Sequence, residues 1–251
     1  MIDYKTALKQ QRKNASVNPN NVYLNWMYDK IQKELGASQN TLEIGAGAGI
    51  SGDFLKNNKI LKTDILSWEG DSVIGNINAE KLPFQNCEFE NILAIDMIHH
   101  ARSPYIVLNE CLRVLKVKGK IIIVEPYVSV FSYFIYKIFH HEDTSWRIDL
   151  NTLAEKVNEP FEGNQGISKE LFKNEKRKSK FLQSIDSKIE VEIELISFLS
   201  FFATGGLSKP LKTPRKLISV FIKIERKMPQ VLFKMLASRI FIVIKKIEGI
   251  S

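Results

Sequence analysis

Cysteine is scarce in this 251-residue chain, and the sequence contains neither an internal repeat nor a low-complexity tract. The two cysteines, Cys87 and Cys111, have neither the spacing of a zinc site nor the number that a disulfide framework needs. No His, Cys and carboxylate cluster has metal-ligand spacing either, so we expect no metal. Only a magnesium site built from carboxylates far apart in the sequence stays open.

Long apolar runs are also missing. The longest, residues 128–139 and 193–203, fall well short of the roughly 20 residues that a membrane-spanning helix needs. The opening residues 1–5 include an acid and no apolar block, which is not typical of a secretory signal. We therefore expect a cytoplasmic protein without a spanning helix. Hydrophobic content of 44% with 25% charged residues excludes disorder and allows a real core.

Acidic residues are nearly absent from one segment. The net charge is +8, yet residues 1–126 carry 15 Lys and Arg against 14 Asp and Glu. Residues 209–246 carry 11 basic residues and a single acid, Glu225. The excess positive charge therefore belongs to this segment, and an anionic partner is expected there.

Short apolar runs alternate with helical patterns through the middle of the chain. Strands are expected at residues 41–44, 60–64, 73–76, 91–96 and 120–125, with helices at 20–35, 51–58 and 104–115, the last with Ser103 as its N-cap. Such alternation is typical of an α/β fold with a doubly wound, mostly parallel sheet. We assign residues 1–38 to an N-terminal helical cap and residues 39–126 to the sheet's ligand-binding core.

Beyond Pro126 the alternation fails. Residues 128–139 are apolar and helical in pattern, and residues 158–187 are polar and loop-rich. Residues 188–197 alternate as a half-buried strand, residues 210–236 have helical periodicity interrupted at Pro229, and residues 239–246 fit a last strand. Residues 127–251 are therefore expected to supply helical insertions and to complete the same sheet.

Three alternating glycines, Gly45, Gly47 and Gly49, follow the first expected strand, where a backbone can approach a ligand closely. Gly47, Gly49 and Gly52 even satisfy the G-x-G-x-x-G pattern of dinucleotide folds. The register argues against a dinucleotide, because the loop starts at Gly45 and the third glycine would fall at Ile50. A pyrophosphate would also lie near the Glu43 carboxylate, which a cationic ligand would tolerate.

The stretch from Glu43 to Gly49 resembles motif I of the class I S-adenosylmethionine (SAM) methyltransferases. Further segments resemble that family's motifs in the right order, namely Thr63-Asp64, Asn78 to Phe84, Asn91 to His100, and Arg113 to Lys116 followed by Gly119. Together they cover about residues 40–126. Two departures occur: Asn78 replaces the usual Asp, and Val117-Lys118 replaces Pro-Gly in a remote turn.

The resemblance implies a Rossmann-like domain that binds SAM. Glu43 would face the amino group of the ligand, Asp64 would hold the ribose hydroxyls, and Asn78 would still reach the adenine amine through its carbonyl. The full set of implied SAM-binding residues is Glu43, Gly45, Ala46, Gly47, Gly49, Asp64, Asn78, Ala79, Glu80 and Asp96.

Methyl transfer needs an aligned nucleophile and sometimes a base. His99 and His100 follow the fourth strand, at the edge where ligands bind in open α/β sheets, and one of them could instead be a buried structural imidazole. His141, among His140, Glu142 and Asp143, either lines the acceptor pocket or is an ordinary helix end. No Asn/Asp-Pro-Pro-Tyr motif follows strand four, which argues against methylation of a nucleobase amine.

The predicted function is methyl transfer from SAM to a small acceptor. Glu125 to Tyr127, with Phe139 to Glu142, also loosely resembles bacterial methyltransferases of polysaccharide and lipid-linked glycan pathways. The alternatives are a non-catalytic SAM-binding or partner-binding protein, and an RNA methyltransferase. The basic segment lacks the glycine and aromatic interleaving of a base-stacking surface, so nucleic acid is the weaker candidate.

Two binding surfaces are predicted, one for the acceptor and one for a membrane. The acceptor is expected between the N-terminal cap and residues 128–143, against an aromatic wall that could equally be core, formed by Tyr23, Trp26, Tyr133, Tyr136 and Trp146. Residues 209–246, basic and amphipathic, would either lie peripherally on an anionic membrane, at its inner face, or simply cover the sheet.

Overall fold

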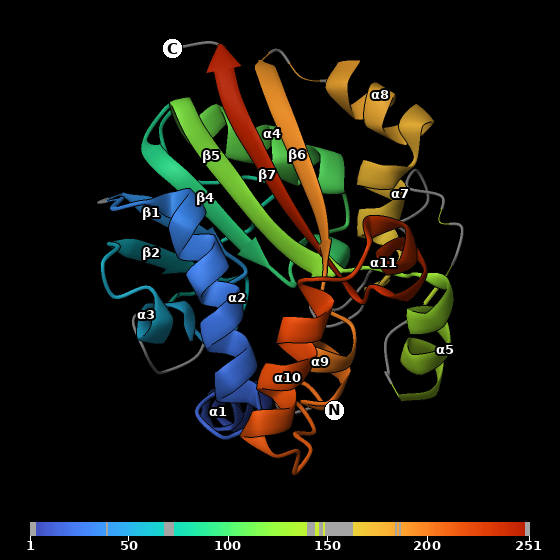
Figure 1. The fold of residues 1–251 in the computed structure, drawn as a ribbon. Helices are drawn as coiled ribbons and strands as arrows, with labels where there is room; N and C mark the ends of the chain where they lie inside the picture. Colours follow the sequence, from blue (N-terminus) through green and yellow to red (C-terminus); the bar gives the residue numbers. More distant parts are fainter. Residues whose placement is uncertain are drawn as a thin grey trace.

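A seven-stranded sheet forms the centre of the protein, with strand order β3-β2-β1-β4-β5-β7-β6 (Figure 1). The computed structural model describes residues 4–38, 40–67, 73–139, 144–145, 148, 163–183, 185 and 187–248. Five strands are parallel: β1 (Thr41–Ile44), β2 (Ile60–Thr63), β3 (Val73–Ile74), β4 (Phe89–Ile95) and β5 (Leu115–Pro126). Strand β7 (Arg239–Glu248) runs antiparallel between β5 and β6 (Lys188–Ile196). The predicted α/β class and all seven strands are confirmed.

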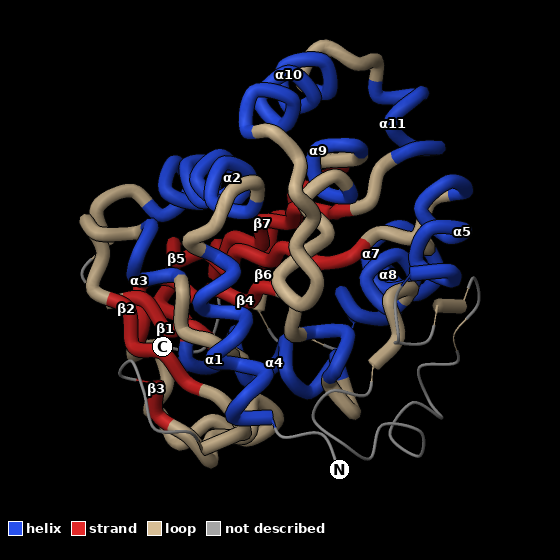
Figure 2. The backbone as a smooth tube through the Cα atoms, turned by 90° about the horizontal axis from the view of Figure 1, so that it is seen from below, coloured by secondary structure: helices blue, strands red, loops and turns tan. Residues whose placement is uncertain are grey.

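Helices cover both faces of the sheet (Figure 2). They are α1 (Tyr4–Ala15), α2 (Asn20–Leu35), α3 (Ser51–Phe54), α4 (Pro104–Val114), α5 (Val130–Phe139), α7 (Ile167–Lys173), α8 (Glu175–Gln183), α9 (Leu199–Phe202), α10 (Arg215–Glu225) and α11 (Gln230–Leu236), with a 3-10 turn at Ile98–His100. In the described ranges, no helix combines the length and the apolar character that crossing a bilayer requires.

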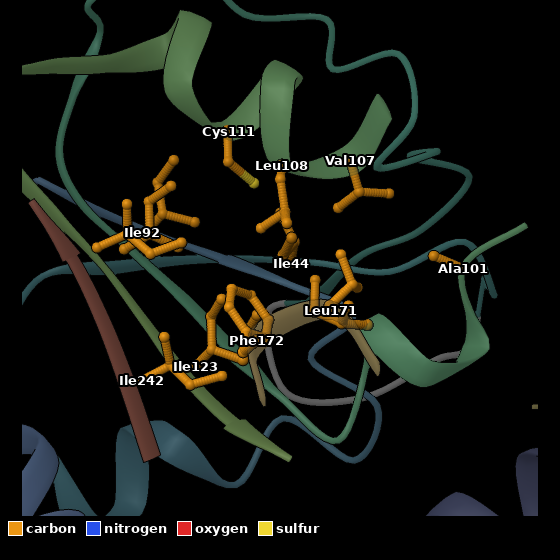
Figure 3. Close-up of a cluster of buried hydrophobic side chains, with 14 of the residues drawn as sticks. Ile44, Ile92, Ala101, Val107, Leu108, Cys111, Ile123, Leu171, Phe172 and Ile242 are labelled. Atoms are coloured by element: carbon orange, nitrogen blue, oxygen red, sulfur yellow. The ribbon is translucent and has the colours of Figure 1, made fainter. Parts of the chain in front are cut away.

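The core consists of two apolar layers, one on each face of the sheet. Side chains alternate along β5, so that Ile123 faces α4 and α7 while Ile122 faces α2 and α10. Figure 3 shows the first layer, in which Val107, Leu108 and Cys111 project from α4 toward the sheet and Phe172 lies beside Ile123. Burial of both faces explains why the central strands read as continuous apolar runs rather than as alternating ones.

Two local expectations need correction. Helix α3 spans only four residues instead of residues 51–58, because Leu55 leaves the helical backbone region and the chain turns, with the N–H of Asn58 donating to the Leu55 carbonyl at 3.1 Å. Residues 158–187, expected to be loop-rich, contain two helices, α7 and α8, which bury Phe172 and Phe181. Ser103 is the N-cap residue of α4 and Pro104 begins the helix, as predicted, although the Ser103 side chain makes no capping hydrogen bond.

The carboxyl ends of the parallel strands meet at one edge of the sheet, and β4 and β5 point toward its lower end, above α9 and α10, in Figure 1. Because β7 runs the other way, its first residue, Arg239, joins that edge beside Pro126, the last residue of β5. Ligands of open α/β sheets bind at this edge. The glycine loop after β1 and the acids after β2 and β4 lie there too.

Lys246 is a buried lysine near the opposite edge, 1% exposed, and it links β7 to the end of α4. Its Nζ donates to the carbonyl oxygens of Leu112 and Leu115, both at 2.9 Å. A cation is favourable at a helix C-terminus, where carbonyl groups lack partners within the helix.

We predict that Lys246→Met lowers the free energy of unfolding by about 2 kcal/mol, because two buried carbonyls lose a charged donor. The neighbouring Lys245 is exposed, and Lys245→Met makes the same change of charge and shape. That control should stay within about 0.5 kcal/mol of the parent. Urea unfolding of the three proteins measures both effects, and equal losses in the two variants would contradict this role for Lys246.

Candidate active site

The loop after β1 depends on glycine at three positions. Gly45, Gly47 and Gly49 have φ angles of +61°, +49° and +66°, a region that other residues adopt at a cost. A Cβ on Gly45 would lie 2.2 Å from Cγ of Met97, so this position has no room for a side chain. Ala46 donates its N–H to the Thr63 carbonyl at 2.9 Å, which ties the loop to the end of β2.

Glu43, in β1, is a buried acid beneath this loop and only 3% exposed. Burial raises the pKa of Glu43 to about 7, although a hydrogen bond from Ser51 and the charge of Lys62 both lower it. Lys62 reaches across from β2 and donates to the Gly49 carbonyl at 3.1 Å. The loop therefore lies between a carboxyl group and an ammonium group that are both buried.

Asp64, directly after β2, is the second buried acid of the site. Its Oδ2 accepts the N–H of Gly47 at 2.7 Å and its Oδ1 accepts the N–H of Leu66 at 2.8 Å. Burial raises the pKa of Asp64 in spite of these two backbone donors. The structure thus brings both acids predicted for the cofactor to the glycine loop, Glu43 through Ser51 just after the loop and Asp64 through Gly47 within it.

Residues 78–80 lie next to Asp64. The N–H of Ile77 donates to the Asp64 carbonyl at 3.0 Å, and the Oδ1 of Asn78 accepts the N–H of Glu80 at 2.9 Å. Glu80 in turn accepts the N–H of Ser103 at 2.7 Å, which secures the turn that enters α4. Ala79 is buried in the first apolar layer. All three residues therefore stand at the carboxyl edge, with structural bonds of their own.

Asp96 ends β4 with a φ of +52° and a carboxylate that is 46% exposed. Its Oδ1 accepts from Nη1 of Arg239 at 2.6 Å. Arg239 is itself 3% exposed and stacks over the ring of Phe201, at 5.0 Å from the ring centroid. A buried arginine thus orients a half-exposed carboxylate at the mouth of the sheet. The sequence did not lead us to predict Arg239 as a site residue. A single basic residue at the start of an apolar strand is the signal that could have indicated this role.

Glu125, at the end of β5, organises the turn that carries the two histidines. Its Oε1 accepts the N–H groups of Met97 at 2.8 Å and Ile98 at 2.7 Å, and its Oε2 lies 2.6 Å from Nδ1 of His99. Burial alone would raise the pKa of Glu125, but the charge and hydrogen bond of His99 and the two N–H groups bring it below its ordinary value. Ser168 of α7 donates to Oε2 at 3.3 Å.

The two adjacent histidines therefore differ in position. His99 is 2% exposed and engaged with Glu125, which matches the alternative of a buried structural imidazole. His100 is half-buried, with its ring centroid 4.0 Å from that of His99. His141, with His140, Glu142 and Asp143, lies outside the described residues, so its predicted role stays a prediction. Within the described ranges, no three His, Cys, Asp or Glu side chains gather as metal ligands.

The predicted aromatic wall is partly core. Tyr23 is 4% exposed and its hydroxyl lies 2.8 Å from Oγ of Ser197, while Tyr136 is 3% exposed and donates to the Ser238 carbonyl at 2.6 Å. Trp26 and Tyr133 are half-buried. Trp146 lies outside the described residues. The first two tyrosines therefore stabilise the carboxyl edge, and only the half-buried pair retains surface for an acceptor.

Helix α1 covers the glycine loop, a contact that the sequence pattern did not indicate. Leu8 is buried, and its Cδ2 would lie 3.8 Å from a Cβ on Gly47. Arg12 donates from Nη1 to the Ala48 carbonyl at 3.2 Å and pairs with Asp53 at 3.3 Å. The N-terminal cap is therefore part of the loop's surroundings.

Comparison with known proteins fits this geometry. Residues 42–123 match the family model of a methyltransferase domain, a range that includes the glycine loop, Glu43, Asp64, residues 78–80, Asp96 and the two histidines. No curated protein matches the sequence.

Solved structures share the fold. A SAM-dependent methyltransferase from Archaeoglobus fulgidus is 13% identical with a TM-score of 0.53, and the match covers 89% of this chain and 93% of that one. The [4+2]-cyclase SpnF is 14% identical with a TM-score of 0.52, covering 90% and 82% of the two chains. Phosphoethanolamine N-methyltransferase 2 of Haemonchus contortus, solved with SAM, is 13% identical with a TM-score of 0.50, covering 98% of this chain and 60% of that one.

The chain therefore has the fold of the SAM-dependent methyltransferases, and residues 42–123 match a methyltransferase domain within it.

We predict that the stability of the protein without ligand falls as the pH rises from about 4.5 to about 7, because the folded state holds a proton on Glu43 that the unfolded chain has lost. The shift corresponds to a loss on the order of 3 kcal/mol across this window. Glu43→Gln should flatten the pH dependence and be more stable than the parent above neutral pH.

Urea unfolding at several pH values measures this effect, with Glu192→Gln on the exposed side of β6 as the matched control. The control should retain the slope of the parent. An unchanged slope in Glu43→Gln would show that Glu43 does not hold the proton.

Proposed function

We propose that the carboxyl edge binds SAM over the glycine loop and that the protein transfers its methyl group to a small acceptor. The observation that carries this proposal is the pairing of Glu43 and Asp64, two buried acids that face the loop from β1 and β2. Burial raises the pKa of both carboxyl groups. A ligand with a cationic amino group and ribose hydroxyls would supply the partners that such acids need.

The types of these residues and their order along the chain both suit such a ligand. Glu43 would attract the amino group, Gly45, Ala46, Gly47 and Gly49 would allow close backbone approach, and Asp64 would hold the ribose. The segment Asn78, Ala79 and Glu80, bonded beside Asp64, would flank the adenine. When bound, SAM supplies an electrophilic methyl group on a sulfonium centre, so the protein has mainly to orient the acceptor and manage its proton.

Two groups at the mouth of β4 are the candidates for that task. Asp96 offers a half-exposed carboxylate that Arg239 holds in one orientation. Of the two adjacent histidines, His100 is partly exposed, whereas His99 is buried against Glu125. Either group could accept a proton from an acceptor hydroxyl or amine. We therefore place the catalytic function at Asp96 and His100 and assign His99 a positioning role.

The loose resemblance at residues 125–127 supports an acceptor carried on a lipid or a sugar. SpnF, a cyclase by its title, has a similarly related fold, so the fold alone does not decide the reaction. A protein that binds SAM without turnover is the alternative, and RNA methylation is the weaker one.

Label transfer tests the activity. The full chain is incubated with methyl-labelled SAM and separate pools of lipids, nucleotide sugars and RNA, and mass spectrometry follows the label. We expect labelled lipid or sugar products and their loss in Asp96→Asn. Tight SAM binding with no labelled product in any pool would favour the binding protein, and labelled RNA alone would favour the RNA enzyme.

We predict that Asp64→Ala weakens SAM binding by about 1.5–3 kcal/mol, the scale of a hydrogen bond to a charged group. Calorimetric titration with SAM measures the effect, and Asp29→Ala, an exposed acid on α2, is the matched control. Because Asp64 also holds the N–H of Gly47, unfolding is measured in parallel to confirm that the variant is folded at the titration temperature. Unchanged SAM affinity in a folded Asp64→Ala protein would refute the ribose assignment.

A further inference from the structure

Exposed apolar side chains are concentrated on three helices, α5, α10 and α11. Eighteen large apolar residues are exposed in the part of the chain that the structure describes, and ten of them belong to these helices. The ten are Val130, Phe131, Phe134, Ile138, Leu217, Val220, Ile224, Val231, Leu232 and Met235. Helix α11 packs against α5, and Figures 1 and 2 both place α10 next to α11. We call the exposed side chains of α5 and of residues 209–236, which include α10 and α11, the basic apolar face.

Helix α10 has two apolar sides, only one of which packs against the protein core. Ile218 and Ile222 are buried in the second core layer. Leu217, Val220 and Ile224, spaced three and four residues apart, are 41%, 47% and 53% exposed. One side of α10 therefore covers the protein core, as one of the two predictions for this segment stated, and the other side faces outward. Contact of that outward side with a membrane stays a prediction.

The charge of the basic apolar face has one sign. Every Lys and Arg from residue 209 to residue 234 is exposed, eight in all. The single acid of that stretch, Glu225, is 7% exposed, and its carboxylate accepts the N–H groups of Phe198 at 3.1 Å and Ser200 at 2.8 Å. Lys137 adds an exposed cation on α5. The acid that could offset the positive charge is thus turned into the protein.

We propose that the basic apolar face docks on an anionic lipid bilayer. Side chains such as Phe134, Ile138 and Val231, 59%, 71% and 75% exposed, would enter the interface, with the lysines against the headgroups. A second copy of the chain fits less well, because two faces of the same charge repel each other. RNA would satisfy the lysines but would leave the apolar side chains in water.

Docking would bring the candidate active site toward the lipid. Helix α5 begins four residues after Pro126, the end of β5, and Glu225 of α10 secures the turn that follows β6. Both connections join the basic apolar face to the carboxyl edge of the sheet. Binding to the bilayer is independent of SAM, whereas delivery of a lipid-borne acceptor to this edge rests on the proposed function.

Co-sedimentation of the full chain tests the charge requirement, with vesicles of phosphatidylcholine alone or mixed with phosphatidylglycerol at low and high salt. We expect strong binding to the anionic vesicles only, weakened by salt. The triple variant Lys216→Glu, Lys223→Glu and Lys227→Glu should bind at least about tenfold more weakly. Its matched control changes three exposed lysines away from this face, Lys56, Lys59 and Lys116, to Glu and should bind like the parent.

A second pair of variants tests the apolar side chains. Ile138→Ser with Val231→Ser should lose the binding that remains at high salt, whereas Ile74→Ser with Ile106→Ser, also exposed but on other elements, should not. Circular dichroism and SAM titration confirm that each variant is folded. They also distinguish a loss of vesicle binding from a failure of the proposed SAM-binding function. Negligible binding to both vesicle types at low salt would overturn the proposal. So would equal loss in a variant and its control, or binding to RNA without binding to vesicles.

Discussion

The buried carboxylate of Glu125 connects the parts of the candidate active site. It accepts hydrogen bonds from the backbone of Met97 and Ile98, contacts the His99 ring and reaches Ser168 of α7. The turn that it fixes places Met97 against Gly45, where no side chain could fit on the glycine. The shape of the loop after β1 therefore depends on an acid at the end of β5, two strands away in the sheet.

The acids of the site differ in how well the protein compensates their charge. The charge of His99 and the backbone donors outweigh burial at Glu125 and lower its pKa, so that this acid is held ionised. At Glu43 and Asp64 burial dominates, and the pKa of each is raised. The charge of Glu125 is thus compensated within the protein, whereas a cationic, hydroxyl-bearing ligand would stabilise the ionised forms of Glu43 and Asp64. This contrast separates the structural acid from those assigned to binding.

Sequence patterns predicted the features that depend on local chemistry. The strand before Gly45, the acid after β2 and the helix break at Pro229 follow from residue type and spacing alone. Patterns did not predict Arg239 or Glu125 as site residues, because each acts through partners far along the chain, Asp96 in one case and Met97 in the other. Nor could periodicity divide the apolar residues of α10 into a buried and an exposed set, since tertiary packing makes that choice.

The central claim is that the glycine loop with its two acids selects SAM, and that the G-x-G-x-x-G match at Gly47 does not indicate a dinucleotide site. Calorimetric titration of the unmodified protein with SAM and, separately, with NADH tests this claim most directly. The account predicts saturable binding of SAM and no measurable binding of NADH, whose pyrophosphate would lie near Glu43. Tighter binding of NADH than of SAM would contradict it.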